Sequence, residues 1–355
     1  MNAWPVYKKK LPSGPGPGGT GMNMSQYRSS LKDAVQGDSG TPRAQPSVLS
    51  ALNKCNRRLE KLLADLRNEQ NAESELRGIA REVIAAVDLN PDVALASIFL
   101  SQIAGTYAVR HCIETAIVVI LVARRMRKNQ SEVLMLAAAA LTMNVGMLRH
   151  QNTFHKSSSL SCDELDIVRR HPVESVDLLR DAGVKDEEWI GCVLMHHEND
   201  DGSGYPDGRT SEDITQGARL ISLADRYCAQ VSARNYRCSV KPDKALHNLL
   251  GEPDKVIDTV LAESFIGLLG KYPPGSLVRL RNGEIGVVTQ CDHAGEIHIH
   301  CLRDAAGKSL RDAGGLIAAM RRASDPDCAI SEVLSEDQAD VRFSMKQIWG
   351  EQASL

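Results

Sequence analysis

Two adjacent histidines begin the stretch of this sequence with the most potential for chemistry. His196 and His197 are followed by a run of acidic and amide side chains, and residues 196–208 also hold three glycines and one proline. Neighbouring side chains on a helix point about 100° apart, so both imidazoles can act on one ligand only where several helices meet. Glycine costs about 1 kcal/mol and proline about 3 kcal/mol in a helix interior. The pattern therefore predicts a helix that ends in two histidines, with a rigid loop after it.

Three further side chains could join this pair. His111 lies in a helical stretch, His171 stands directly before a proline, and Asp225 follows an apolar run. One buried histidine is more often a core residue than a ligand. Four histidines and a carboxylate on helices form the kind of ligand set that Fe, Mn or Zn selects. The sequence thus predicts a divalent-metal site. The alternatives are a capped helix end with a surface turn, or a hydrogen-bonded polar cluster in the core.

The composition favours a helical protein. The chain has 355 residues, enough for one large domain or two ordinary ones. Hydrophobic residues make up 43% of it but aromatic residues only 4%, so the core must consist of Leu, Val, Ile, Ala and Met. Such residues suit helices.

The charge, the cysteines and the apolar runs limit which partners the protein is expected to bind and where in the cell it is expected to be. The formal net charge of −3 supplies no basic field for binding nucleic acid. The nine cysteines form no C-x-x-C pair, which is typical of reduced thiols in the cytoplasm. The first residues show no signal peptide, and the longest apolar run, residues 133–141, is far shorter than the roughly 18 residues that span a bilayer. We expect a cytoplasmic protein without a membrane span.

The chain divides into five segments by its local patterns. Residues 1–47 are rich in glycine and proline and predict a disordered tail. Residues 48–90 predict a helical segment that either docks on the next domain or dimerises, so an oligomer is left open. Residues 91–271 predict a run of helices, and residues 272–302 a small antiparallel β extension with an Asn-Gly hairpin turn. Residues 303–355 are mixed.

Within the helical run, the periodicity predicts individual elements. One helix is expected over residues 93–113 and another over 113–126. An Ala- and Leu-rich helix is expected over 131–147. A helix with a capping box at Ser161 should run through Arg170, and Pro172 should begin the next one. Two further helices are expected at residues 186–197 and 216–234.

These residues resemble the HD-GYP domain, a helical subclass of the HD phosphohydrolases. The similarity covers about residues 95–290, and its most specific part is the His-His-Glu block with the Gly204-Tyr205-Pro206 turn. The other matching segments are His111, residues 138–148, His171-Pro172, residues 224–227 and residues 232–237. The resemblance implies an HD-type multi-helix bundle.

The sequence departs from the family where the name-giving His-Asp pair should stand. In the family, the Asp of this pair bridges two metal ions, the His binds one of them, and a nearby Lys lies close to the substrate phosphate. Here these positions are Met143, Asn144 and Met147. A neutral amide replaces the bridging carboxylate, and a thioether suits Cu(I) rather than Mn or Fe(II). Tyr107 stands where some members carry a ligand for a third metal.

The resemblance assigns the remaining ligands to two metal positions. His111 and Asp225 would belong to the position that lost Met143, which makes them the weaker candidates. His171, His196 and His197 would belong to the other position, and three imidazoles can hold one divalent metal. We expect at most one metal (Fe, Mn or Zn), or none.

The family hydrolyses cyclic di-GMP, and the lost ligands predict a catalytically weak or inactive member. Such a chain would act in cyclic di-GMP signalling by binding a ligand or a partner. By resemblance, Arg234 and Arg237 face phosphates, although they could also be ordinary surface arginines. The loop at Gly204, Tyr205 and Pro206 would dock a GGDEF-type diguanylate cyclase. The alternatives are a phosphodiesterase with a residual mononuclear metal site and a purely structural interaction module.

Overall fold

The computed structural model describes residues 46–154, 160–232, 239–250, 258–292, 295–310 and 320–355. The predicted tail, residues 1–47, lies almost wholly outside these ranges, and so do Arg234 and Arg237. The described helices and strands belong to one compact unit, Gln45–Leu355.

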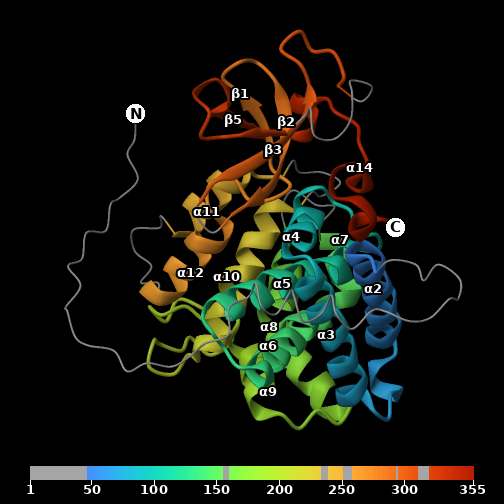
Figure 1. Ribbon diagram of the computed structural model, residues 1–355. Coiled ribbons are helices and arrows are strands. Elements are labelled where there is room, and N and C mark those ends of the chain that lie inside the picture. The colour runs from blue at the N-terminus through green and yellow to red at the C-terminus, as the bar shows by residue number, and fades with distance from the viewer. Residues whose placement is uncertain (1–45, 155–159, 233–238, 251–257, 293–294, 311–319) are drawn as a thin grey trace, which may run out of the picture. The chain divides into compact units, whose positions relative to one another are not determined.

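The prediction of a mainly helical protein with a small C-terminal antiparallel sheet is confirmed (Figure 1). The helices up to residue 269 are α2 (Val48–Ala64), α3 (Ala72–Leu89), α4 (Pro91–Phe99), α5 (Tyr107–Arg125), α6 (Gln130–Thr142), α7 (Leu148–Phe154), α8 (Cys162–Asp181), α9 (Glu187–Met195), α10 (Gln216–Val231), α11 (Pro242–Leu250) and α12 (Thr259–Leu269).

Helix α5 lies at the centre of the helical part. Every residue from His111 to Ala123 is buried, and α5 packs against α3, α6 and α10. A helix that is apolar nearly all round is stable only when other helices cover it on most sides. This burial carries His111 into the interior of the protein. Helix α2 also packs on α3 and α5 within the same chain, so the docking alternative for residues 48–90 is the one that the structure contains.

The single helix predicted over residues 93–113 is wrong. Helix α4 ends at Phe99, and α5 begins at Tyr107 after an irregular loop. Two buried asparagines of α2 hold this loop: the Asn56 side chain donates to the carbonyl of Ala104 at 2.7 Å, and Asn53 accepts from the Ala104 backbone N–H at 2.8 Å. Because these bonds satisfy backbone groups outside any helix, a tertiary contact overrides the local periodicity.

Pro172 does not begin a helix, as predicted, but lies inside α8, which runs unbroken from Cys162 to Asp181. A proline in a helix removes the N–H that would bond to the carbonyl four residues earlier, here that of Val168. That carbonyl instead accepts a hydrogen bond from His171 Nδ1 at 2.6 Å. The proline therefore leaves no polar group unpaired and gives the neighbouring histidine a fixed partner.

The helix predicted over residues 131–147 is too long, because α6 ends at Thr142 and a short 3₁₀ turn follows at Val145–Met147. The Ser175 hydroxyl of α8 accepts from the Gly146 N–H at 2.9 Å and donates to the Met143 carbonyl at 3.0 Å. A Cβ at Gly146 would lie 2.6 Å from the His171 carbonyl oxygen and 2.7 Å from the Ser175 nitrogen. The turn that carries Met143 and Asn144 is thus held tightly against α8.

The C-terminal sheet is larger than the three strands predicted over residues 272–302. It has five antiparallel strands in the order β4-β3-β2-β1-β5, and β5 reaches Leu334. The strands are β1 (Leu277–Leu280), β2 (Ile285–Cys291), β3 (Ile297–Arg303), β4 (Met320–Arg322) and β5 (Ile330–Leu334), followed by α13 (Glu336–Ala339) and α14 (Met345–Trp349). Separate apolar clusters that include Val287 and Val288 line its two faces, so sequence neighbours fill opposite layers.

One helical stretch of the described residues, Gln130–Gln151, is long and apolar enough to cross a membrane. However, 72% of its apolar window is buried inside the structure. The core helix of a globular protein passes the same test, so this stretch is weak evidence for a span.

The close approach at Gly146 predicts a destabilising substitution. Gly146→Ala should lower the free energy of unfolding by about 1–3 kcal/mol, because the new methyl group would meet backbone atoms that cannot move separately. Urea unfolding followed by circular dichroism measures this change.

The matched control is Gly78→Ala in α3, where a Cβ would meet nothing within 4 Å. This variant should be neutral or more stable by about 0.5–1 kcal/mol. Equal stabilities of the two variants would contradict the tight packing of the 143–147 turn on α8.

Candidate metal centre

Three histidines from two helices meet in the interior. His171 lies in α8, His196 caps the C-terminus of α9, and His197 follows it. One ligand nitrogen from each lies within 4.8 Å of the other two, and His171 Nε2 is 3.2 Å from His196 Nε2. His171 and His196 are fully buried. The structure therefore brings together the three residues that the sequence predicts as the stronger metal ligands.

The backbone fixes which nitrogen of each buried imidazole carries the proton. His171 Nδ1 and His196 Nδ1 each lie 2.6 Å from a carbonyl oxygen three residues earlier, those of Val168 and Val193. A carbonyl oxygen only accepts, so both Nδ1 atoms must be the donors. In the neutral rings, both Nε2 atoms then present lone pairs to each other across 3.2 Å.

Two facing lone pairs repel each other unless a proton or a metal cation lies between or beside them. Nitrogen ligands about 2.0–2.1 Å from one tetrahedral metal ion lie about 3.3 Å apart, close to the spacing found here. A metal-bound histidine usually donates its other N–H to a carbonyl or carboxylate, as both of these do. The donor set therefore fits one divalent ion held by His171, His196 and His197.

Burial keeps this cluster neutral. Desolvation, followed by the neighbouring His196, lowers the pKa of His171 to about 3. Desolvation also lowers the pKa of His196, and it lowers that of His197 well below the usual value with help from the other two imidazoles. Only neutral imidazole binds a metal, so the cluster remains ready to do so at neutral pH.

His111 and Asp225, the two weaker candidates for metal ligands, pair with each other. His111 Nε2 donates to Asp225 Oδ1 at 2.7 Å, and both side chains are buried. Burial alone would raise the pKa of Asp225, but the hydrogen bond from His111 holds that pKa well below its usual range. The ring of Tyr107 stacks on His111 with its centroid 5.5 Å away. Nε2 of His111 is thus occupied by Asp225.

The residues that replace the His-Asp pair are also buried, Met143 at 0% and Asn144 at 1% exposure. Asn144 Oδ1 has no hydrogen-bond partner among the described residues. An unpaired oxygen is a possible neutral ligand, but it lacks the charge of a carboxylate that bridges two dications. Met147 is buried as well. These three positions are thus buried and carry no charged side chain.

Comparisons with known proteins place this geometry in a family. A model described as HD domain matches residues 57–261, more than half of the chain. The chain belongs to the HD domain family. This confirms the resemblance seen in the motifs, and HD-domain phosphohydrolases typically use divalent metals.

The similar proteins are bacterial phosphodiesterases. The chain is 30% identical over 210 residues to a cyclic di-GMP phosphodiesterase of Pseudomonas aeruginosa, covering 59% of this chain and 50% of that protein. It is 25% identical over 196 residues to a cyclic di-GMP phosphodiesterase of Borreliella burgdorferi, covering 55% and 52%. The chain thus spans about half the length of these relatives. An HDG"Y"P protein from Bdellovibrio bacteriovorus shares the fold, with a TM-score of 0.53, 17% identity and coverage of 69% and 80%.

One carboxylate, that of Glu198, holds the loop that follows the histidines. Glu198, buried at the end of α9, accepts from the backbone N–H groups of Asp207 at 2.8 Å and Arg209 at 2.9 Å. Sequence reasoning grouped Glu198 with the acidic run and missed this role, because no local pattern shows that its carboxylate bonds to backbone groups nine and eleven residues further along the chain. The loop also carries Tyr205 onto the histidines, where its ring stacks on His197 with centroids 4.7 Å apart.

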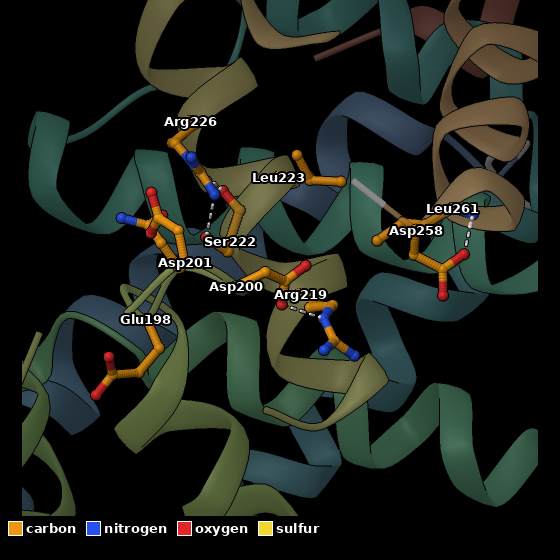
Figure 2. A pocket seen from close by; sticks show the side chains of 10 residues that line it. Glu198, Asp200, Asp201, Arg219, Ser222, Leu223, Arg226, Asp258 and Leu261 are labelled. Atoms are coloured by element: carbon orange, nitrogen blue, oxygen red, sulfur yellow. Dashed lines mark hydrogen bonds and ion pairs between the residues drawn. The ribbon is translucent and has the colours of Figure 1, made fainter. Parts of the chain in front are cut away.

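A small pocket of about 40 Å³ lies beside this loop, and Figure 2 shows its lining. Arg219 donates to Asp200 at 2.8 Å, and Arg226 donates to the Ser222 hydroxyl at 2.9 Å. A space of this size holds a few water molecules at most.

The neutral cluster predicts acid sensitivity of the metal-free HD domain. The pKa of His171 is lowered in the folded state, so below about pH 6.5 the unfolded chain binds a proton that the folded chain does not. Stability should therefore fall as pH decreases from about 6.5 towards 3, by up to about 1.4 kcal/mol per pH unit for this imidazole.

Urea unfolding in the presence of a chelator at several pH values measures this slope. His171→Leu should have a shallower slope over the same range, because the unfolded variant has one proton fewer to gain. Parallel stability curves for the two proteins would show that His171 is not held neutral by burial.

Proposed function

We propose that this chain is a degenerate HD-GYP module of cyclic di-GMP signalling that binds one divalent metal and a ligand or partner but hydrolyses weakly or not at all. The observation that carries the proposal is the contrast between the two halves of one buried site. The three-histidine half keeps every ligand and its backbone support, whereas Met143 and Asn144 occupy the other half.

The chemistry of the relatives supports cyclic di-GMP as the ligand class, because similar proteins carry the name cyclic di-GMP phosphodiesterase. A cyclic dinucleotide is an anion and needs positive charge beside the metal. Arg226 in α10 lines the small pocket beside the loop, and Arg169 lies in α8 two residues before His171. We propose these arginines as phosphate contacts, alongside Arg234 and Arg237, whose role stays a prediction.

A bound divalent ion would supply Lewis-acid charge to a phosphate oxygen. The chain's own residues would do the rest: His171, His196 and His197 hold the ion, while the carbonyls of Val168 and Val193 orient two of the rings. Efficient hydrolysis needs a second ion and its bridging carboxylate, for which Asn144 offers no charge. Loss of one comparable electrostatic group costs on the order of 10²–10³ in rate.

The eight described cysteines are free, which supports the proposed cytoplasmic location. A diguanylate cyclase with a GGDEF domain remains the proposed protein partner. The Tyr205 ring already packs on His197, so such a partner would meet the rim of the loop rather than this ring.

The central test combines metal analysis, calorimetry and turnover on the purified chain. We expect one equivalent of Fe, Mn or Zn per chain, binding of cyclic di-GMP, and turnover at least about 100-fold below that of an intact relative assayed in parallel. Rapid turnover with Mn(II) or Fe(II) would refute the proposal that the module hydrolyses weakly or not at all. Absence of ligand binding would favour the structural module.

A residual mononuclear phosphodiesterase is the second candidate, favoured by the intact three-histidine cluster. His196→Ala distinguishes it: this variant should lose the metal and any slow turnover together. Turnover that survives in His196→Ala would exclude the three-histidine cluster as its source.

Restoring the lost pair provides a gain-of-function test. Met143→His with Asn144→Asp and Met147→Lys should raise the metal content from one to two per chain and the turnover by about 100-fold or more. The turn held by Ser175 and Gly146 is expected to present the new side chains towards His111 and Asp225.

The matched control is Met143→Leu with Asn144→Gln, which alters the first two positions without adding a charged ligand. Thermal melting should show that both proteins are folded. If the restored variant folds but gains neither metal nor turnover, the residues at these three positions are not what limits catalysis.

A further inference from the structure

The loop of residues 198–210 covers the three-histidine cluster with one aromatic ring. Tyr205 stacks on His197 with centroids 4.7 Å apart and an interplanar angle of 25°. The same ring meets His171 edge-on, at 6.4 Å and 74°. Offset stacking and edge contacts at such distances are the favoured geometries of aromatic pairs. Tyr205 therefore touches two of the three candidate ligands at once.

The position of this ring is fixed by the backbone on either side of it. A Cβ at Gly204 would lie 2.4 Å from the Asn199 nitrogen, 2.5 Å from the Glu198 Cα and 2.6 Å from the His197 carbonyl oxygen. Only glycine lets the loop cross the end of α9 this closely. The Tyr205 N–H then donates to the His197 carbonyl at 3.2 Å, so the ring and the histidine beneath it share one backbone anchor.

The far side of the loop is held as firmly. Glu198 accepts two backbone N–H groups from residues beyond the proline, and Asp201 pairs with Thr210 in a short antiparallel bridge. Tyr205 is thus clamped between two anchored segments and is not a free side chain on a loose turn.

His197 needs such a support more than its two neighbours do. His171 and His196 are each oriented by a hydrogen bond from Nδ1 to a backbone carbonyl, but no comparable bond is found for His197 among the described residues. The His196 and His171 rings also contact His197, with centroids 4.1 and 5.0 Å away, and the Tyr205 ring is the contact from outside the cluster that restricts its rotation and shields one of its faces.

We propose that Tyr205 is a positioning residue that orients His197 and covers the three-histidine cluster, acting through the face of its ring and not through its hydroxyl. One consequence of this proposal rests on the proposed metal site: an oriented His197 should hold a metal more tightly. The other part of the proposal, that Tyr205 shields His197, does not depend on a metal.

Two readouts test the two parts separately. In the metal-free chain, diethyl pyrocarbonate acylates accessible neutral imidazoles, and mass spectrometry of peptides gives the rate at His197. Tyr205→Ala should raise this rate at least ten-fold, whereas Tyr205→Phe should match the wild type. The exposed His247 serves as internal reference in every sample. An unchanged rate at His197 in Tyr205→Ala would overturn the proposal.

Zinc titration against a competing chelator tests the consequence. Tyr205→Ala should bind zinc about 10- to 100-fold more weakly, the usual cost of losing an outer support of a metal ligand, and Tyr205→Phe should bind normally. Equal losses in both variants would assign the role to the hydroxyl and contradict the proposal. If the wild type binds no zinc, the proposed metal site fails, and the acylation rates alone decide the role of Tyr205.

Asp207→Ala is the matched control within the loop. The Asp207 side chain pairs with Arg209 at the surface, while its contact to Glu198 comes from the backbone N–H and survives the substitution. This variant should leave both the acylation rate at His197 and the zinc affinity unchanged. If Tyr205→Ala melts at a lower temperature, Tyr205→Leu retains apolar bulk, and it should still expose His197 because it lacks the planar ring.

Discussion

The contact on which the site depends is the approach of two imidazole nitrogens that both carry lone pairs. His171 Nε2 and His196 Nε2 lie 3.2 Å apart, and each ring has already committed its Nδ1 proton to a backbone carbonyl. Left alone, this arrangement is repulsive, and burial denies either ring an easy proton. A divalent cation is the simplest partner that turns the repulsion into attraction. The two rings thus present their Nε2 atoms to one point, as ligands of a single cation would.

The elements around the cluster can be understood as supports for that contact. Pro172 frees the Val168 carbonyl for His171, and the end of α9 frees the Val193 carbonyl for His196. Both supports use the same device, a helical carbonyl that has lost its N–H partner, once through a proline and once through a helix terminus. His197 has neither and is supported by an aromatic ring instead. Two imidazoles are thus oriented by local breaks in helical structure, and the third contacts a stacked ring.

Much of this was accessible from the sequence, and the failures have definite physical causes. The residue types and the family motif identified His171, His196 and His197, and the aliphatic composition predicted the helical fold. The helix boundaries at residues 100–106 and at Pro172 were wrong because distant side chains, such as Asn56, and a neighbouring imidazole satisfy the backbone there. Strands β4 and β5 were missed because each is short and pairs with residues about 20 or more positions away, which no local pattern records. The hydrogen bonds from the loop backbone to Glu198 were missed because no local pattern links these residues either.

The buried polar groups of the site also differ in how they are paired. Met143 and Asn144 fill a buried space that the fold holds in place through Ser175 and Gly146, so the apolar thioether and the neutral amide cost less desolvation than an imidazole and a carboxylate without their metal. His111 and Asp225 remain because they satisfy each other, and removal of one would strand a buried charge or donor. The three-histidine half has no such internal compensation. The cluster instead presents neutral nitrogen ligands, the donor set that the proposed divalent metal would use.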